Sequence, residues 1–432
     1  MHEPLKLLNT SAGCDSCCIF RVPRSPSEIN EKAYQPHIVS IGPFHHREPH
    51  FQMIQQHKWR FLGDLLFRGE RKSVVLKDFF EVVAPMEEDI RKSYSETLEF
   101  HGRDLIQMMV LDGCFIIELF CKVKSLGDAS KDPSLVEAVR KDPLFTMAWV
   151  LPFLMRDLLQ LENQIPYTVL QELFDMSVGS GKDGSSLTKL ALRFFNYGVQ
   201  RLEHVLEKYY DKKPTHLLDL FRMSYIPVNC QDKARGPSKF LHLIQCATKL
   251  HQAGVRFKPR KTHNILDVKF KNGILEIPVL IIDDFWSSLF LNVVAYEQCY
   301  AHPPKDITRT IFTTYATLMG CLINTPADAG FLGDHKIIKN YFGTDEEVAR
   351  FLNNVRKEVA FDIRRSYLSK VFEEVNEYYE NDWHVYWAGF KHRYFNTPWS
   401  FISAAAAGVL LLLTTIQAFY SAYPYLPRDK NH

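Results

Sequence analysis

The sequence predicts a mainly α-helical globular body with a small β-hairpin and one C-terminal transmembrane helix. Three observations predict this fold class. Apolar residues recur at the spacing of amphipathic helices over most of the chain. One Asn-Gly pair separates two short strand-like runs. A long stretch without charged residues lies near the C-terminus.

The composition narrows the class of protein. The 432 residues include 52 Lys and Arg against 50 Asp and Glu, which gives a net charge of +2. This balance excludes an acidic disordered chain and a histone-like basic chain, and it argues against nucleic acid as the main partner. Nine cysteines are an odd number and too few for a disulfide-built scaffold, so free thiols in a reducing compartment are expected.

Periodicity and capping residues locate the helices. Apolar residues follow helical spacing over residues 187–206 and again over residues 368–379, where charged residues occupy the opposite face. Thr344 is a good N-cap for a helix whose first turn is acidic, because negative charge favours the positive end of a helix. Asp283-Asp284 begin a further helix in the same way.

The predicted hairpin precedes that last helix. Residues 265–270 alternate apolar and polar side chains, and a second short run covers residues 274–277 and ends at Pro278. Asn272-Gly273 lie between the two runs, and Asn-Gly in this position is the strongest short-range signal for a hairpin. A two-stranded ribbon is therefore expected.

The stretch from Trp399 to Tyr423 predicts the transmembrane helix. At about 1.5 Å per residue it is roughly 37 Å long, which is enough to cross a hydrocarbon core of about 30 Å. Aromatic residues at both ends are typical of bilayer interfaces, whereas a buried core helix rarely runs this long without a charge. The residues expected to form the membrane anchor are Trp399, Ile402, Leu410, Leu411, Leu412, Leu413, Ile416 and Tyr420.

This anchor sets the expected organisation and location. The short tail after the span predicts post-translational insertion into the plasma membrane or an endomembrane, with the body facing the cytosol, and polar residues near the N-terminus argue against a signal peptide. The lipid bilayer is then one partner. The expected segments are a flexible leader (1–17), the helical body (18–393), the juxtamembrane and transmembrane anchor (394–427) and a short tail (428–432).

A histidine-rich segment invites a metal hypothesis. His45, His46, His50 and His57 lie close together, after a strand-like run at residues 40–44 that enters a turn. Their spacing matches neither H-E-x-x-H nor a Cys/His finger, so structural or surface histidines are the favoured interpretation.

Three other motifs lack the context that their chemistry needs. The C-x-x-C-C sequence at residues 14–18 has no second Cys or His pair for zinc. The G-x-G-x-x-G match at residues 179–184 follows a predicted helix instead of the strand that dinucleotide binding requires. The basic cluster at residues 256–261 lacks the aromatic–basic interleaving typical of RNA-binding segments, and a solvated loop is expected there. No metal, cofactor or nucleic acid is therefore predicted.

Several acids and an amide lie in apolar surroundings. Asp112 and Glu118 share one apolar segment, and Glu162-Asn163 lie in another. Buried acids have partners or shifted pKa values, and acids with shifted pKa values are candidates for acid–base work. Structural pairing is favoured, for example Glu162 capping a helix that starts at Pro166. The candidate functional cluster consists of His45, His46, Asp112, Glu118, Glu162 and Asn163.

These stretches together resemble the plant family known as domain of unknown function 247. The resemblance covers nearly the whole chain, although Arg47 stands where Gly usually continues the family's His-His pair. The ordered motifs that carry it include C-I-F-R-V-P at 18–23, Y-Q-P-H-I-V-S-I-G-P-F-H-H at 34–46, D-G-C-F and E-L within 109–119, L-E-N-Q-I-P within 157–170, A-T-K-L at 247–250 and Y-F-G at 341–343.

The resemblance implies a plant protein with a helical body and a C-terminal membrane anchor, in a class linked to recognition or signalling. It supplies no substrate and no cofactor. The expected function is therefore non-enzymatic recognition or signalling through an unidentified protein partner, and the oligomeric state stays open. The alternative is a metal-dependent hydrolase that uses His45, His46 and the acids Asp112, Glu118 or Glu162.

Overall fold

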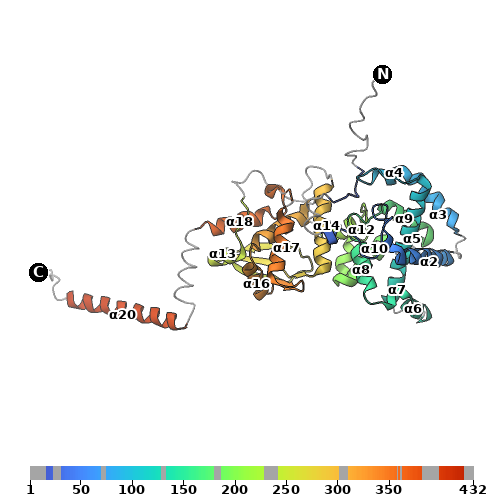
Figure 1. Ribbon diagram of the computed structural model, residues 1–432. Helices are drawn as coiled ribbons and strands as arrows, with labels where there is room; N and C mark the ends of the chain where they lie inside the picture. Colours follow the sequence, from blue (N-terminus) through green and yellow to red (C-terminus); the bar gives the residue numbers. More distant parts are fainter. Residues whose placement is uncertain are drawn as a thin grey trace, which may run out of the picture.

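A computed structural model gives the architecture of the chain (Figure 1). It describes residues 16–22, 31–69, 74–127, 133–179, 186–227, 242–300, 310–357, 359–360, 362–381 and 398–422. In this part of the chain helices dominate, as the sequence predicts, and the named strands form two small sheets.

The N-terminal half surrounds one long helix, α5 (Gly102–Gly127). Nearly every side chain from Leu105 to Cys121 is buried, because this segment is apolar on all sides. Helices α2, α3, α6, α9 and α10 pack against α5. The other helices of this half are α2 (Gln52–Gly69), α3 (Leu76–Val83), α4 (Glu87–Lys92), α6 (Pro133–Arg140), α7 (Pro143–Thr146), α8 (Val150–Asp157), α9 (Tyr167–Ser177), α10 (Leu187–Val199), α11 (Glu203–Leu206) and α12 (Leu217–Met223).

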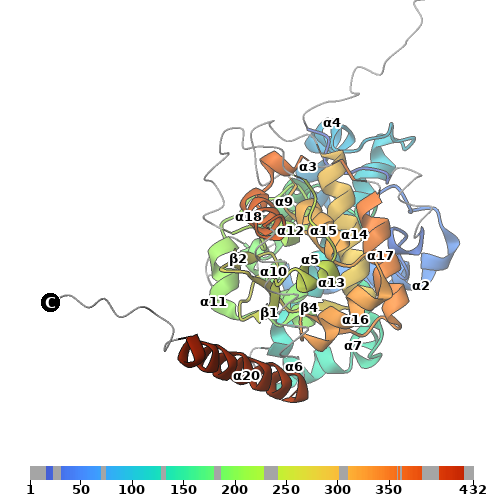
Figure 2. The same cartoon turned by 90° about the vertical axis from the view of Figure 1, so that its left-hand side faces the viewer.

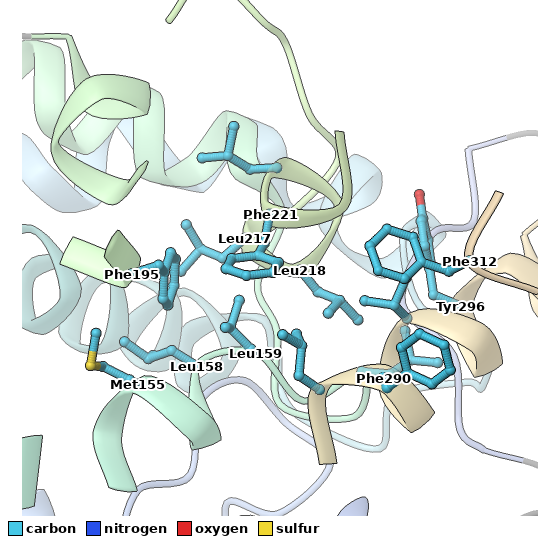
Figure 3. Packing of buried hydrophobic residues seen from close by; sticks show 14 of the residues in the cluster. Met155, Leu158, Leu159, Phe195, Leu217, Leu218, Phe221, Phe290, Tyr296 and Phe312 are labelled. Atoms are coloured by element: carbon cyan, nitrogen blue, oxygen red, sulfur yellow. The ribbon is translucent and has the colours of Figure 1, made fainter. Parts of the chain in front are cut away.

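Helix α14 (Asp284–Cys299) lies between the two halves (Figure 1). It contacts α8 and α12 of the first half and α15 of the second, and Figure 3 shows Phe221 and Phe290 of the shared core between them. The remaining helices of the second half are α13 (Ala247–Gln252), α15 (Ile311–Leu322), α16 (Pro326–Asp334), α17 (Asp345–Lys357) and α18 (Ser369–Tyr379). Single 3-10 turns are η1 (Glu31–Ala33), η2 (Pro49–Phe51), η4 (Ala84–Met86), η5 (Glu207–Tyr209) and η7 (Ile363–Arg365).

A buried ion pair also joins the two halves. Nε of Arg222 on α12 donates to Glu297 on α14 at 2.8 Å, and the two side chains are 2% and 0% exposed. Glu297 also accepts the backbone N–H of Thr313 at the start of α15. Burial lowers the pKa of Arg222, but the nearby carboxylates outweigh burial and raise it. Arg222 is therefore held as a buried cation by its partners.

The predicted hairpin is present. Strands β2 (Lys269–Lys271) and β3 (Ile274–Pro278) pair antiparallel. The φ angles of Asn272 and Gly273 are 52° and 70°, as a two-residue type I′ turn requires.

Two further strand pairs come from non-local pairing. Strand β1 (Arg256–Arg260) runs parallel to β3, so the order of the sheet is β1-β3-β2, and the prediction of a loop at the basic cluster is wrong. Phe257 is buried between exposed neighbours, and this side chain anchors β1 to the core. Strands β4 (Leu280–Ile282) and β5 (Ile338–Asn340) form a parallel pair. Strands β1, β2 and β4 are labelled in Figure 2.

The helices predicted from caps are confirmed. Thr344 accepts the N–H of Glu347 through its hydroxyl at 3.3 Å, and the Glu347 carboxylate accepts the N–H of Thr344 at 2.8 Å, so a reciprocal capping box begins α17. Asp283 caps α14 through the N–H of Trp286. The periodic stretch at residues 187–206 instead divides into α10 and α11, because Gln200 takes a left-handed conformation with φ 55° and ends α10.

The predicted transmembrane anchor is wrong. Its residues do form a helix, α20 (Pro398–Ala422), in which the leucines from Leu410 to Leu413 are exposed. Polar residues, including Thr414, Thr415 and Gln417, interrupt the apolar run in the second half of this helix. Over the ranges given above, the fold contains no helix with both the length and the apolar character that crossing a bilayer takes.

Candidate functional site

Two of the candidate residues, Asp112 and Asn163, hold one irregular segment, residues 37–42. This segment has bends at residues 37, 38 and 42 and no strand pairing, although the sequence predicts a strand-like conformation for its last residues. It lies in the interior, where backbone N–H groups need acceptors. Side chains from α5 and from residues 157–163 supply those acceptors.

Asp157 and Asn163 hold the first part of the segment. The Asp157 carboxylate accepts the N–H groups of His37, Ile38 and Val39 at 2.8–3.0 Å. Asn163 accepts the N–H of Ile41 through Oδ1 at 2.6 Å and donates from Nδ2 to the carbonyl of Val39 at 3.0 Å. These side chains replace the hydrogen bonds that a neighbouring strand would give.

Asp112 on α5 holds the end of the segment. Its Oδ2 accepts the N–H of Gly42 at 2.8 Å, and its Oδ1 accepts Nζ of Lys58 at 2.5 Å. Lys58 comes from α2 and also donates to the carbonyl of Ser40. Both charged side chains are 1% exposed, so Asp112 is paired in the interior rather than open to a substrate.

Gly42 is required by the close packing of the segment. Its φ is 75°, and an added Cβ would lie 2.5 Å from the carbonyl oxygen of Gln164. Only a glycine combines this left-handed backbone with so close an approach.

Glu162 links His45, which follows the segment, to the start of the described chain. Its carboxylate accepts the N–H of Val22 at 2.8 Å and Nη1 of Arg21 at 3.0 Å. It therefore does not cap the helix after Pro166, as the sequence suggested. Nε2 of His45 lies 3.3 Å from Glu162 Oε2, at a distance typical of an ion pair but without the alignment of a good hydrogen bond.

Nδ1 of His45 also lies 2.6 Å from Oε1 of Glu48. Burial lowers the pKa of His45, but its contacts with Glu162 and Glu48 outweigh burial and raise it above 6.5. Burial likewise raises the pKa of Glu162, but His45, the N–H of Val22 and the charge of Arg21 together lower it below 4.5. The two groups therefore favour each other's charged forms.

The other two candidates, His46 and Glu118, have different surroundings. His46 is half-buried against Phe100, and burial lowers its pKa. Glu118 lies further along α5, where Oε1 is 3.9 Å from Nζ of Lys122, which also contacts Asp64 and Asp142. The structure thus places Asp112 and Asn163 against the segment, pairs Glu162 with His45 just after it, and places Glu118 in a separate charge cluster.

Sequence reasoning missed two central residues. Lys58 occupies the buried face of α2, between Ile54 and Phe61, and a lysine on an apolar face is itself a signal of a buried partner. Asp157 precedes a run of leucines and has the same apolar setting as Glu162. An acid in such a setting is expected to be buried and to have a partner, so the sequence could have identified Asp157 as well.

The metal and nucleotide motifs receive no support from the described geometry. Across the ranges given above, no group of three or more His, Cys, Asp or Glu side chains is placed to hold a metal ion. Cys18 is a free thiol, whereas Cys14 lies outside the described residues. Most of the G-x-G-x-x-G match, residues 180–184, also lies outside them.

Comparisons with known proteins point to one family. Residues 19–413 match the model of domain of unknown function 247, described as plant protein of unknown function. The UPF0481 protein At3g47200 of Arabidopsis thaliana is 41% identical over 453 residues, which cover 100% of this chain and 91% of the relative. The putative UPF0481 protein At3g02645 of the same plant is 24% identical, with 93% and 89% covered. No solved structure matches the chain.

Gly42→Ala tests the packing of the segment. The added Cβ meets the Gln164 carbonyl and the backbone stays in the left-handed region, so a loss of about 2 kcal/mol or more in unfolding free energy is expected. Gly63→Ala is the matched control, because Gly63 lies in α2 with open space around it and should gain up to about 1 kcal/mol. Urea unfolding measures both, and equal effects would contradict the proposed packing.

The His45–Glu162 pair predicts a pH dependence of stability. The raised pKa of His45 gives stability that is complete below pH 6.5 and is lost as pH rises through the folded-state pKa. The lowered pKa of Glu162 gives stability that is present above pH 4.5 and is lost as pH falls through its folded-state pKa. His45→Gln should therefore lower the unfolding free energy most between pH 4.5 and pH 6.5.

The measurement is the difference in unfolding free energy between wild type and His45→Gln across pH 4 to 8. The exposed His204, changed to Gln, is the control for replacing a histidine outside the pair. A His45→Gln difference that stays flat with pH would rule out the coupled pair.

Proposed function

The chain belongs to the plant family known as domain of unknown function 247, and from this premise we propose that it is a non-enzymatic recognition protein whose helical body binds a protein partner. The family description assigns no activity. The proposal therefore depends on what the candidate acids do in the fold.

One observation carries the proposal: the central acids are already occupied by the protein's own groups. Asp112 is engaged by Lys58 and Gly42, Asp157 by three backbone N–H groups, and Glu162 by Val22 and Arg21. A general acid or base must reach a substrate and exchange a proton with it. Acids buried in this way support a scaffold role.

A rigid scaffold suits recognition. The acceptors hold residues 37–42 in one conformation, so a binding surface built on this body loses little conformational freedom when a partner docks. Surface aromatic residues such as Trp59 and Phe67, which are 48% and 75% exposed, are the kind of side chain that anchors protein interfaces.

The hydrolase alternative has one observation in its favour, because His45 lies between two carboxylates, Glu48 and Glu162. Elemental analysis of the purified full chain separates the two functions. Recognition predicts less than one transition-metal ion per chain, whereas a stoichiometric metal that is lost in His46→Ala and Glu48→Gln would favour the hydrolase.

The positive test identifies and then rebuilds the complex. Cross-linking in plant tissue captures a partner, which is purified and titrated against the purified chain by calorimetry. Saturable one-to-one binding is expected. It should be unchanged in His46→Ala and Glu48→Gln, because recognition of a protein partner needs no metal held by these side chains. Failure of every captured protein to bind as a purified component would contradict the proposal.

A further inference from the structure

A groove between β2 and α18 is a second feature of the molecule, separate from the segment at residues 37–42. Its volume is about 710 Å³, within the range of known binding sites, and both walls come from the C-terminal half. Strand β2 and helix α18 lie next to each other in this half (Figure 2).

The β2 wall is an open sheet edge. β2 pairs with β3 on one side, and in the ranges that the structure describes no strand lies on the other. Lys271 and Ile274 flank a two-residue turn, so they form the hydrogen-bonded pair next to it, and the pairing alternates along the strand. The N–H and C=O of Phe270 therefore point away from β3, toward the open edge.

The side chains of β2 alternate in chemistry. Lys269 and Lys271 are exposed on one face, about 7 Å apart along the strand. Phe270 points to the other face, where its ring lies 5.8 Å from that of Tyr378 on α18. The apolar side chains of Leu368 and Val371 also line the groove on the α18 side.

The charges leave the two lysines available. Arg260 binds Asp267 at 2.9 Å and Glu276 at 2.8 Å, and Lys370 binds Glu374 at 3.4 Å. Each acid that lines the groove is thus held by a cation. Lys269 has only a 4.0 Å contact with Asp267, and among the described residues Lys271 forms no ion pair. The edge therefore carries positive charge.

We propose that this groove binds an extended acidic peptide of a protein partner, which adds to β2 as a further strand. The backbone of one peptide residue pairs with the N–H and C=O of Phe270. Its two neighbours then stand in non-hydrogen-bonded pairs opposite Lys269 and Lys271, where side chains approach most closely. The recognised pattern is acidic–apolar–acidic, with the apolar side chain toward α18.

This inference rests on the proposed function and names the site that the partner would use. The probe is a fluorescein-labelled peptide, Ser-Glu-Val-Glu-Val-Glu-Ser, titrated into the full chain by fluorescence anisotropy. Lys269→Glu with Lys271→Glu should weaken its binding by about tenfold or more, because each reversal turns an attraction into a repulsion. Lys212→Glu with Lys213→Glu makes the same charge change at two exposed lysines that do not line the groove and should leave binding within about twofold.

Two further readouts separate strand addition from attraction by charge alone. Peptides N-methylated at single central amides lack one backbone donor each, and at least one of them should bind about tenfold more weakly. Hydrogen exchange should show new protection of the Phe270 amide when the unmodified peptide is bound.

Equal binding by the two double variants, or by all N-methylated peptides, would overturn the groove as a strand-addition site. Absence of saturable peptide binding would also overturn it. If the partner from the cross-linking experiment still binds the Lys269→Glu/Lys271→Glu variant, the groove fails while the proposed function stands. If no partner binds at all, the proposed function fails, and peptide binding then reports on the groove alone.

Discussion

The fold depends on a backbone that enters the interior without a neighbouring strand. Residues 37–42 present N–H groups that must find acceptors, and each one left unsatisfied would cost about 1–3 kcal/mol. Asp157, Asn163 and Asp112 accept these groups, so the segment is fixed by side chains rather than by a sheet. Buried acids in this position require compensation, which Lys58 supplies to Asp112.

This constraint extends to the second half of the molecule. Asn292 of α14 accepts the N–H of Leu161, next to Glu162, and donates to the carbonyl of Ala33, just before the segment. The ion pair between Arg222 and Glu297 joins the same two halves. The central acids are therefore best understood as parts of the structure that make the body rigid, and a rigid body suits the proposed role in recognition.

Local signals in the sequence predicted local structure well. Thr344 and Asn272-Gly273 determine a cap and a turn through residues close to them, so the start of α17 and the hairpin followed directly from the sequence. Strand β1 was missed, because its partner β3 lies beyond a connection of more than a dozen residues. The transmembrane prediction, which rested on length, aromatic ends and the lack of charged residues, is wrong, because no helix of the described residues is long and apolar enough to cross a bilayer.

The candidate site was located better than it was interpreted. Apolar surroundings identified Asp112, Glu162 and Asn163 correctly as buried or nearly buried polar residues. Their partners lie 54 to 141 positions away in the sequence, and spacing gives no information on contacts at that separation. Asp157 and Lys58 were missed although the sequence marks both, because Asp157 precedes a run of leucines and Lys58 interrupts an apolar helix face.

Amide hydrogen exchange of residues 37–42 tests the central claim most directly. If side chains hold the segment, the N–H groups of Ile38 and Val39 exchange slowly in the native protein. In Asp157→Ala they should exchange at least about tenfold faster, while amides in the middle of α17 keep their protection. Unchanged protection of Ile38 and Val39 in a folded Asp157→Ala variant would contradict the account.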